Sequence, residues 1–576
     1  MTREVHAHAL PGLAVGISNQ SERRRDRRWG AALAVALSVA GCGTDPAPRR
    51  ATARPAPPLG SVDLVVSCDA RAQAEFNRSL ALLHHMTYVQ AREAFRGVAR
   101  RDPGCAMAYW GIAMTLFQPL WPTRPSTADL ETGWQAVEKA RALAPRITAR
   151  ERGYIEAAAA FFRDPRAADY WQRIERWAAA MKALHAAYPD DPEASAFYAL
   201  ALLASARPGP EVAAHSRQAV ALLLPIHRRN PAHPGAMHYI THADDVPGRE
   251  RANLDIIRRY EKVAPDNPHA LHMPTHIFTR LGDWDRVISG NLRAAEAALR
   301  YPAGERRELV WDEFPHAIEY LVYAYLQQGA DAAAAAQIDR MLAIRNLEPS
   351  AKTAFHLAST RARYALERRD WRAAAALVPR QPAVVEWDRF PWPEAVSWFA
   401  RGYGALRSGD AAEPPRALAR LAELEARAGK SGEAVFALQI RILRLELEAW
   451  SAHAARDDAR ALSLLRDAVQ LEGSTPKPAV TPAPTLPAPE LLGELLLELG
   501  RPGEALAAYR QSLDRHPRRF NAALGVVLTL SATGDERGAQ RAYCELLAIG
   551  SKGPRAATLA ALHRFRTNPA GCPSPR

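Results

Sequence analysis

The sequence predicts an all-α fold, a solenoid of stacked helix–turn–helix repeats, and three observations lead to this prediction. The 576 residues are 48% hydrophobic but only 7% aromatic, and Ala and Leu dominate. This composition, with few β-branched runs, favours helices packed through small residues. Short motifs also recur at one repeat length along the chain. A chain this long ordinarily forms several domains, but a repeat needs only its neighbours to bury its apolar face.

The first segment, residues 1–41, has the pattern of a signal peptide. RRRDRRW (Arg23–Trp29) is a basic region, and GAALAVALSVA (Gly30–Ala40) is an apolar stretch too short to span a bilayer. It ends in Val39-Ala40-Gly41-Cys42, which resembles the lipobox of bacterial lipoproteins, where the cysteine carries the lipid. We therefore expect a lipid on Cys42; an ordinary signal peptide with a chance cysteine is the alternative.

The lipobox sets the expected location. The protein is expected in the bacterial cell envelope, facing the periplasm or the exterior. Gly43 follows the cysteine, where an Asp would signal retention in the inner membrane, and this favours the outer membrane. Residues 42–65 contain TDPAPRRATARPAPPLG, a Pro/Ala-rich stretch suited to a tether.

Four cysteines remain after the tether, and an even number in an exported chain permits two disulfides. Cys68 and Cys105 are 37 residues apart, about one repeat. They are therefore expected at the same end of adjacent units, where they can pair. Buried, unpaired thiols are the alternative. The other two are Cys544 and Cys572.

Repeats are predicted over residues 66–472 and again over 491–565. ELLGELLLELGRPGEALAAYRQSLDRHP places small Gly493 where two helices cross and Gly500 at the turn between them. Gly534 stands thirty-four residues after Gly500. At equal offsets from these two glycines stand Ala505 with Tyr509 and Ala539 with Tyr543. This is the tetratricopeptide pattern, and a helix–turn–helix unit of this kind must stack to hide its apolar stripe.

Further motifs extend over most of the chain: CAMAYWGIA, YPDDPEA, HPGAMHYITHADD, HALHMPTHIFTRLG, HAIEYLVYAYLQ and ELLGELLLELG, together spanning roughly residues 70 to 545. On these motifs the chain resembles a family of large bacterial tetratricopeptide-repeat proteins of unassigned function. The resemblance implies the fold and brings no activity with it. Here Tyr239-Ile240-Thr241 and Ala243-Asp244-Asp245 depart from the family's tyrosine-rich and Val-Glu forms.

A second Pro-rich stretch, GSTPKPAVTPAPTLPAPE at residues 473–490, separates the main solenoid from the C-terminal repeat pair. It is expected to be either a surface loop or a hinge. Residues 566–576 form a tail.

Histidines concentrate in two or three neighbouring repeats. Eight of the eighteen lie between His227 and His316. Pro234 and Pro268 are thirty-four residues apart, and each is predicted to open the first helix of a unit. Counted from these prolines, the pair His238/His242 and the pair His272/His276 occupy identical places on the concave face.

This register predicts a metal site. Residues four apart on a helix have Cβ atoms roughly 5–6 Å apart, a spacing that lets two imidazoles chelate one ion. The four histidines of the two pairs are therefore predicted to bind one transition-metal ion. Additional ligands, or partners of the ligands, are predicted to be His269, His316, Asp245 and Glu319. Imidazole with carboxylate suits Zn, Cu, Fe or Ni.

Two alternatives to metal binding remain at this stage. The cluster is a site for a non-metal ligand with histidine as acid and base, or it is structural polar packing. His233 and His269, beside the helix-opening prolines, also fit helix caps.

The sequence contains no motif for nucleophilic, nucleotide-dependent or dithiol redox chemistry. There is no GxSxG, Walker loop, CxxC or Rossmann fingerprint, so no nucleotide cofactor is expected. The net charge of +13 comes largely from Arg scattered among Glu and Asp, without a basic run interleaved with aromatics. We therefore expect no nucleic-acid partner.

Two functions fit these patterns, and the fold does not choose between them. The leading one is a binding scaffold, an exported lipoprotein that holds a metal ion and receives a protein or peptide in its concave groove. The other is a metalloenzyme with its metal inside the solenoid. The sequence assigns neither a reaction nor catalytic residues to it.

Overall fold

The computed structural model describes residues 57–121, 124–166, 169–207, 209, 211–303, 306–430, 434–475, 480–550 and 572. From Ala56 onward the chain forms one compact unit. The predicted signal peptide, the predicted lipid site Cys42 and most of the predicted tether and tail lie outside the described residues.

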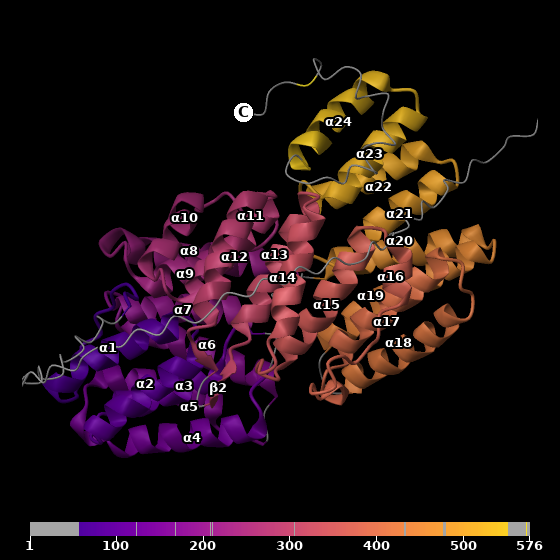
Figure 1. The fold of residues 1–576 in the computed structure, drawn as a ribbon. Coiled ribbons are helices and arrows are strands. Elements are labelled where there is room, and N and C mark those ends of the chain that lie inside the picture. The colour runs from indigo at the N-terminus through magenta and orange to yellow at the C-terminus, as the bar shows by residue number, and fades with distance from the viewer. Residues whose placement is uncertain are drawn as a thin grey trace, which may run out of the picture. The chain divides into compact units, whose positions relative to one another are not determined.

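The described ranges contain 24 α-helices, and most pack against the next one along the chain (Figure 1). This confirms the predicted all-α, tetratricopeptide-type solenoid. The helices of the first half are α1 (Ala70–His84), α2 (Tyr88–Arg101), α3 (Ala106–Phe117), α4 (Thr127–Ala142), α5 (Ala149–Phe162), α6 (Tyr170–Ala187), α7 (Pro192–Ser205), α8 (Glu211–Arg229), α9 (Pro234–Asp244), α10 (Leu254–Val263), α11 (Pro268–Leu281) and α12 (Trp284–Ala298).

The second half continues the pattern. Its helices are α13 (Glu313–Gln327), α14 (Asp331–Ala343), α15 (Ala351–Glu367), α16 (Trp371–Ala375), α17 (Pro391–Arg407), α18 (Glu413–Lys430), α19 (Ala434–Ala454), α20 (Asp458–Ser474), α21 (Ala488–Glu498), α22 (Pro502–Arg515), α23 (Phe520–Ala532) and α24 (Glu536–Ile549). Two short 3₁₀ helices are η1 (Ala144–Arg146) and η2 (Trp387–Arg389).

The helices form an inner and an outer layer. From α7 to α23 each odd-numbered helix contacts the next odd-numbered one, which makes the first helices of the repeats a continuous inner layer. The inner helices α11 and α13 are buried over nearly their whole length. The outer α10, by contrast, buries only Ile256, Ile257 and Tyr260. A helix buried on all sides has no solvent face, so polar side chains on the inner layer need partners.

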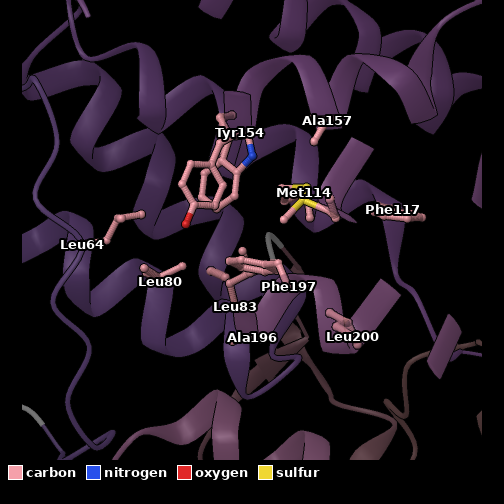
Figure 2. Packing of buried hydrophobic residues seen from close by; sticks show 14 of the residues in the cluster. Leu64, Leu80, Leu83, Met114, Phe117, Tyr154, Ala157, Ala196, Phe197 and Leu200 are labelled. Carbon is pink, nitrogen blue, oxygen red and sulfur yellow. The ribbon is translucent and has the colours of Figure 1, made fainter. Parts of the chain in front are cut away.

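The N-terminal repeats share one apolar core (Figure 2). Phe197 of α7 meets Trp110 of α3 and Tyr154 of α5 edge-on, with ring centroids 5.5 and 6.5 Å apart. Leu80 and Leu83 of α1 belong to the same cluster. Helices from different repeats are thus joined by shared aromatic contacts.

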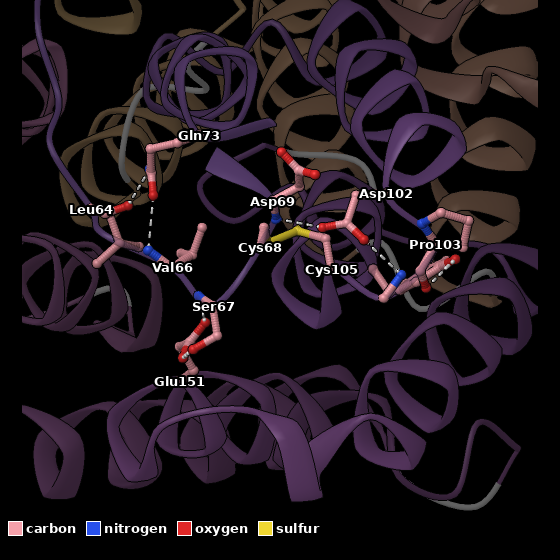
Figure 3. The surroundings of a disulfide bond; sticks show 12 residues. Leu64, Val66, Ser67, Cys68, Asp69, Gln73, Asp102, Pro103, Cys105 and Glu151 are labelled. Carbon is pink, nitrogen blue, oxygen red and sulfur yellow. Dashed lines mark hydrogen bonds between the residues drawn. A yellow bond between two sulfur atoms is a disulfide. The ribbon is translucent and has the colours of Figure 1, made fainter. Parts of the chain in front are cut away.

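Two disulfides are present in the described residues, Cys68–Cys105 and Cys544–Cys572. The first joins the segment before α1 to the start of α3 (Figure 3). Beside it the Asp69 backbone N–H donates to Asp102 Oδ2 at 2.7 Å. The N–H of Ser67 donates to Glu151 Oε1 on α5 at 2.6 Å. The chain before the first helix is therefore fastened to two repeats.

A small hairpin explains the long spacing between Pro268 and Pro315. Strands β1 (Pro302–Ala303) and β2 (Arg306–Val310) pair antiparallel between α12 and α13. The extra residues of this unit thus form a β-hairpin outside the helical pattern.

Residues 480–487 of the second Pro-rich stretch are largely buried. Arg363 of α15 donates to the carbonyl oxygens of Ala483 and Pro484, both at 2.9 Å. The hydroxyl of Tyr320 on α13 lies 3.5 Å from the Thr481 carbonyl oxygen. These residues therefore pack on the inner helices.

A bilayer-crossing helix, judged by length and apolar character, is not found among the residues that the structure describes.

Candidate metal centre

The two predicted helix starts are confirmed. Pro234 and Pro268 are the first residues of α9 and α11. His233 caps α9, since its Nδ1 accepts the Ala236 N–H at 3.1 Å, while Asn267 and not His269 caps α11. Because both helices begin in the same register, the two histidine pairs lie at matching places.

Three of these four places are buried and His242 is half-buried, so they do not lie on an exposed groove as expected. His238 is 0% exposed, His272 1% and His276 4%. These histidines are buried because other segments pack over the inner helices. Helix α1 packs on α9, and Trp121 stacks on His269 with ring centroids 6.1 Å apart.

The structure divides the histidines into two groups of three. His238, His242 and His269, here the first trio, have ring nitrogens within 4.8 Å of one another. The second trio, held within the same distance, is His272, His276 and His316. The two HxxxH pairs thus lie in separate groups, which differs from the expected single cluster of four. The next inner helix completes each pair, since it places a histidine directly after Pro268 or Pro315.

The hydrogen bonds of the first trio place an Nε2 lone pair on His238 and on His269. The Nε2 atoms of all three residues are buried and have no hydrogen-bond partner in the described part of the chain. His238 Nδ1 lies 2.6 Å from the His84 carbonyl oxygen, which only accepts, so the proton is on Nδ1 and the lone pair on Nε2. His269 Nδ1 faces Glu313 Oε2 at 3.4 Å with the same consequence. Metal-ligating histidines are oriented in this way by carbonyl and carboxylate partners.

The electrostatics favour neutral imidazoles. Burial, followed by the neighbouring histidines, holds the pKa of His238 well below its usual range. The same causes lower the pKa of His242 to about 3. For Glu313, burial alone would raise the pKa, but Lys352 and His269 outweigh it and hold it well below normal. His238 and His242 are therefore unprotonated at neutral pH, and Glu313 is ionised.

The two predicted carboxylates each contact an imidazole. Asp245 Oδ2 lies 3.0 Å from His276 Nδ1, and its other oxygen accepts from Arg280. Glu319 accepts from Nδ1 of His356 on α15. Asp245 thus contacts one of the predicted ligands, whereas Glu319 contacts His356, which the sequence did not single out.

Several residues that contact the histidines were not identified from the sequence. His84 and His356 carry no motif that sets them apart, and Asn291, Glu313 and Lys352 look like ordinary helix residues. The carbonyl of His84 reaches His238 from 154 positions away. A backbone oxygen has no sequence signature, so only the tertiary structure reveals it.

A third buried group shows what a structural network looks like. Glu193 accepts from His84 Nε2 at 2.6 Å and from His233 Nε2 at 3.0 Å. The other nitrogen of His84 accepts from the Tyr239 hydroxyl at 2.9 Å, and that of His233 caps α9. Every ring nitrogen here has a partner, so no lone pair is left for a metal.

Two hollows adjoin the trios. A cavity of about 40 Å³ is lined by His242 and His269 of the first trio, His276 and His316 of the second, and also by Glu313 and Lys352. A larger groove of about 640 Å³ is lined by Asp245, Arg280, Tyr323 and the Pro-rich residues Pro482 and Pro484, among others. The chain thus has a groove for a ligand beside its histidine cluster.

No protein family model matches the sequence. No curated protein matches it either. Among solved structures, the human IFIT1 dimer with m7Gppp-AAAA is similar at 12% identity and a TM-score of 0.36, over 77% of this chain and 90% of that chain. A monomeric IFIT1 mutant with Gppp-AAAA gives 11% and 0.35, over 80% and 90%. Likeness at this level says nothing about what this chain binds.

Proposed function

We propose that this chain is an exported helical-repeat scaffold that holds a transition-metal ion at His238, His242 and His269 beside a ligand groove. One observation carries the metal proposal: the three buried Nε2 atoms of one histidine group have no hydrogen-bond partner among the described residues. A buried polar atom left unpaired costs roughly 1–3 kcal/mol, and three together are explained when an ion binds them. Three imidazoles suit Zn or Cu, with Fe or Ni as further candidates.

Export and lipid anchoring are part of the same proposal. The basic and apolar segments before Cys42, and the lipobox itself, support an anchor in the bacterial envelope, with the outer membrane favoured by Gly43. The two disulfides support an oxidising compartment, because thiols in the cytosol are kept reduced.

The groove of about 640 Å³ supports the scaffold role. Its lining contains the acids Asp245, Glu250 and Asp514 against the strong bases Arg280 and Arg515. Glu472 also lines it, but burial raises the pKa of this carboxyl to about 7. Such a lining favours a peptide or protein segment with basic side chains. It disfavours the phosphate backbone of a nucleic acid, which binds to surfaces rich in Lys and Arg.

A metalloenzyme is the second candidate, and the small cavity favours it. Three protein ligands leave a coordination position open, as catalytic zinc sites do. The cavity of about 40 Å³ beside the first trio has room for water.

The test is metal content and thermal melting of the full chain, stripped with chelator and reloaded with Zn²⁺. Wild type is expected to bind the ion and to melt at a higher temperature when loaded, by mass action. A His242→Gln/His269→Gln variant should lose this binding, while His233→Gln, from the fully paired network, should keep it. Equal metal content in wild type and the double variant would refute the first-trio site.

A further inference from the structure

His272 and His276 present an unusual contact. Their Nε2 atoms lie 2.9 Å apart, and the two rings meet nearly edge-on with centroids 4.9 Å apart. Such a contact is an ordinary hydrogen bond only when one of the two nitrogens carries a proton. The positions of the protons on these rings therefore decide what the contact is.

The partner of His272 places its proton on the far nitrogen. His272 Nδ1 lies 2.6 Å from Asn291 Oδ1. The Asn291 amide N–H groups donate to the Val287 carbonyl at 2.8 Å and to Thr275 Oγ at 3.1 Å, so its oxygen must face the ring. His272 Nδ1 therefore donates, and its Nε2 carries a lone pair.

His276 likewise carries its proton on Nδ1 and a lone pair on Nε2. Its Nδ1 lies 3.0 Å from the carboxylate oxygen Oδ2 of Asp245, which only accepts. Two lone pairs thus face each other across 2.9 Å. The Tyr320 hydroxyl, 3.4 Å from His276 Nε2, has one proton, and the Thr481 carbonyl at 3.5 Å competes for it. The Tyr320 proton is therefore not donated to His272 Nε2.

A third lone pair comes from His316. The Glu319 carboxylate accepts from His356 Nδ1, and it also accepts from the Ser359 hydroxyl at 2.7 Å. His356 Nε2 is then an acceptor, and it lies 3.1 Å from His316 Nδ1, which donates to it. The Nε2 of His316 is left with a lone pair. Its ring lies against His272, with centroids 4.2 Å apart.

We infer that His272, His276 and His316 hold a second transition-metal ion, and that the two trios form a two-metal centre facing one cavity. Two nitrogens bound to one ion at 2.0–2.1 Å lie about 2.9–3.4 Å apart for bond angles between 90° and 109°. The observed 2.9 Å is at the lower end of this range. A cation between the lone pairs replaces their repulsion by two bonds.

The cavity indicates what the centre binds. Both trios line it: His242 and His269 belong to the first trio, and His276 and His316 belong to the second. Its volume of about 40 Å³ suits water-sized ligands. Lys352 also lines it, with its charge balanced by Asp312 at 2.7 Å and by Glu313. The cavity therefore admits water or another small oxygen ligand beside both trios.

The two-metal centre rests on the proposed first-trio site, whereas the second ion does not need it. The full chain is stripped with chelator and titrated with Co²⁺ and with Zn²⁺ by calorimetry, and bound metal is counted by elemental analysis. Wild type should bind two ions per chain. His272→Gln/His316→Gln and His238→Gln/His269→Gln should each bind one. His233→Gln, the matched control from the fully paired group, should bind two.

The outcomes separate the two ideas. One ion in wild type, lost only with the first-trio variant, overturns the second site and leaves the proposed function standing. If wild type binds one ion and each double variant loses it, the two trios share a single ion, and the two-metal centre is overturned. The two-metal centre is also overturned if wild type binds one ion that only the second-trio variant loses. No ion in wild type overturns both proposals. Should a variant fail to fold, anomalous diffraction from zinc-loaded wild-type crystals decides, since two peaks are expected, one at each trio.

Discussion

At the scale of single residues, the partner of the second ring nitrogen separates structural histidines from ligand candidates. His85 uses both nitrogens, with Nδ1 2.8 Å from the Tyr260 hydroxyl and Nε2 3.0 Å from the Leu59 carbonyl oxygen. Among the described residues, His238 and His269 have a hydrogen-bond partner at Nδ1 and none at Nε2. All three rings are buried. Burial by itself therefore does not separate the two kinds of histidine, whereas the pairing of Nε2 does.

The buried His85 predicts how stability depends on pH. Burial lowers its pKa to about 3 in the folded chain. The unfolded chain takes up this proton near pH 6.5, so the contribution of His85 is present above that pH and lost as pH falls toward about 3. His85→Gln keeps both hydrogen-bonding roles and should flatten the pH dependence of unfolding by up to one proton, about 1.4 kcal/mol per pH unit. Urea unfolding between pH 6.5 and 4 measures this, and equal slopes in both proteins would contradict it.

Glu313 is predicted to orient a metal ligand. Its carboxylate faces His269 Nδ1, and such a partner typically changes metal affinity 10- to 100-fold. Glu313→Gln should therefore weaken Zn²⁺ binding by about this factor in a competition titration with a chromophoric chelator. Glu193→Gln, from the network whose nitrogens are all paired, is the control and should leave the affinity unchanged. Equal affinities in the two variants would exclude the orienting role.

At the scale of elements, the histidine pattern is a repeat feature. Each trio combines the HxxxH pair of one inner helix with the histidine after the proline of the next: α9 with His269 of α11, and α11 with His316 of α13. One step along the solenoid thus carries the first trio onto the second. Two similar sites follow from stacking two similar units.

The C-terminal repeats predict a packing test. Tyr509 of α22 lies between Gly493 of α21 and Gly525 of α23, and a Cβ at Gly525 would stand 2.3 Å from its ring. Gly525→Ala should therefore destabilise this segment, since overpacking commonly costs ~1–3 kcal/mol. Gly503→Ala, on the exposed side of α22 with open space around it, should be neutral or stabilising by up to about 1 kcal/mol. Thermal melting compares the two, and a stabilised Gly525→Ala would show that the close contact is absent.

At the scale of the whole molecule, the location of the protein is predicted to depend on Cys42, which lies outside the described residues. The lipobox predicts that wild type fractionates with membranes in a Gram-negative host, favouring the outer membrane. Cys42→Ala should shift it to the soluble periplasmic fraction, because one residue carries the lipid. The Cys68–Cys105 disulfide should form in both and reports that export occurred. A variant that stays with the membranes would rule out the anchor.

The sequence by itself determined the repeat class, the starts of α9 and α11, and the small residues at helix crossings. These are local properties, because hydrophobic period, helix-opening proline and glycine spacing act within one unit. It also indicated which helices carry the histidines. The pairing of Cys68 with Cys105 was one of two open alternatives, and the structure places the two sulfurs in a bond.

Only the tertiary structure decided how the histidines divide into trios, that they are interior, and which acceptors hold their Nδ1 atoms. The sequence placed the two pairs on one exposed groove, because helical periodicity shows which face a residue occupies and not what covers that face. The cover comes from distant segments: α1, Trp121 and the Pro-rich stretch from Val480 onward. Contacts between residues 100 or more positions apart depend on the curvature of the stacked repeats. The residues of one repeat do not indicate which distant segment will pack against it.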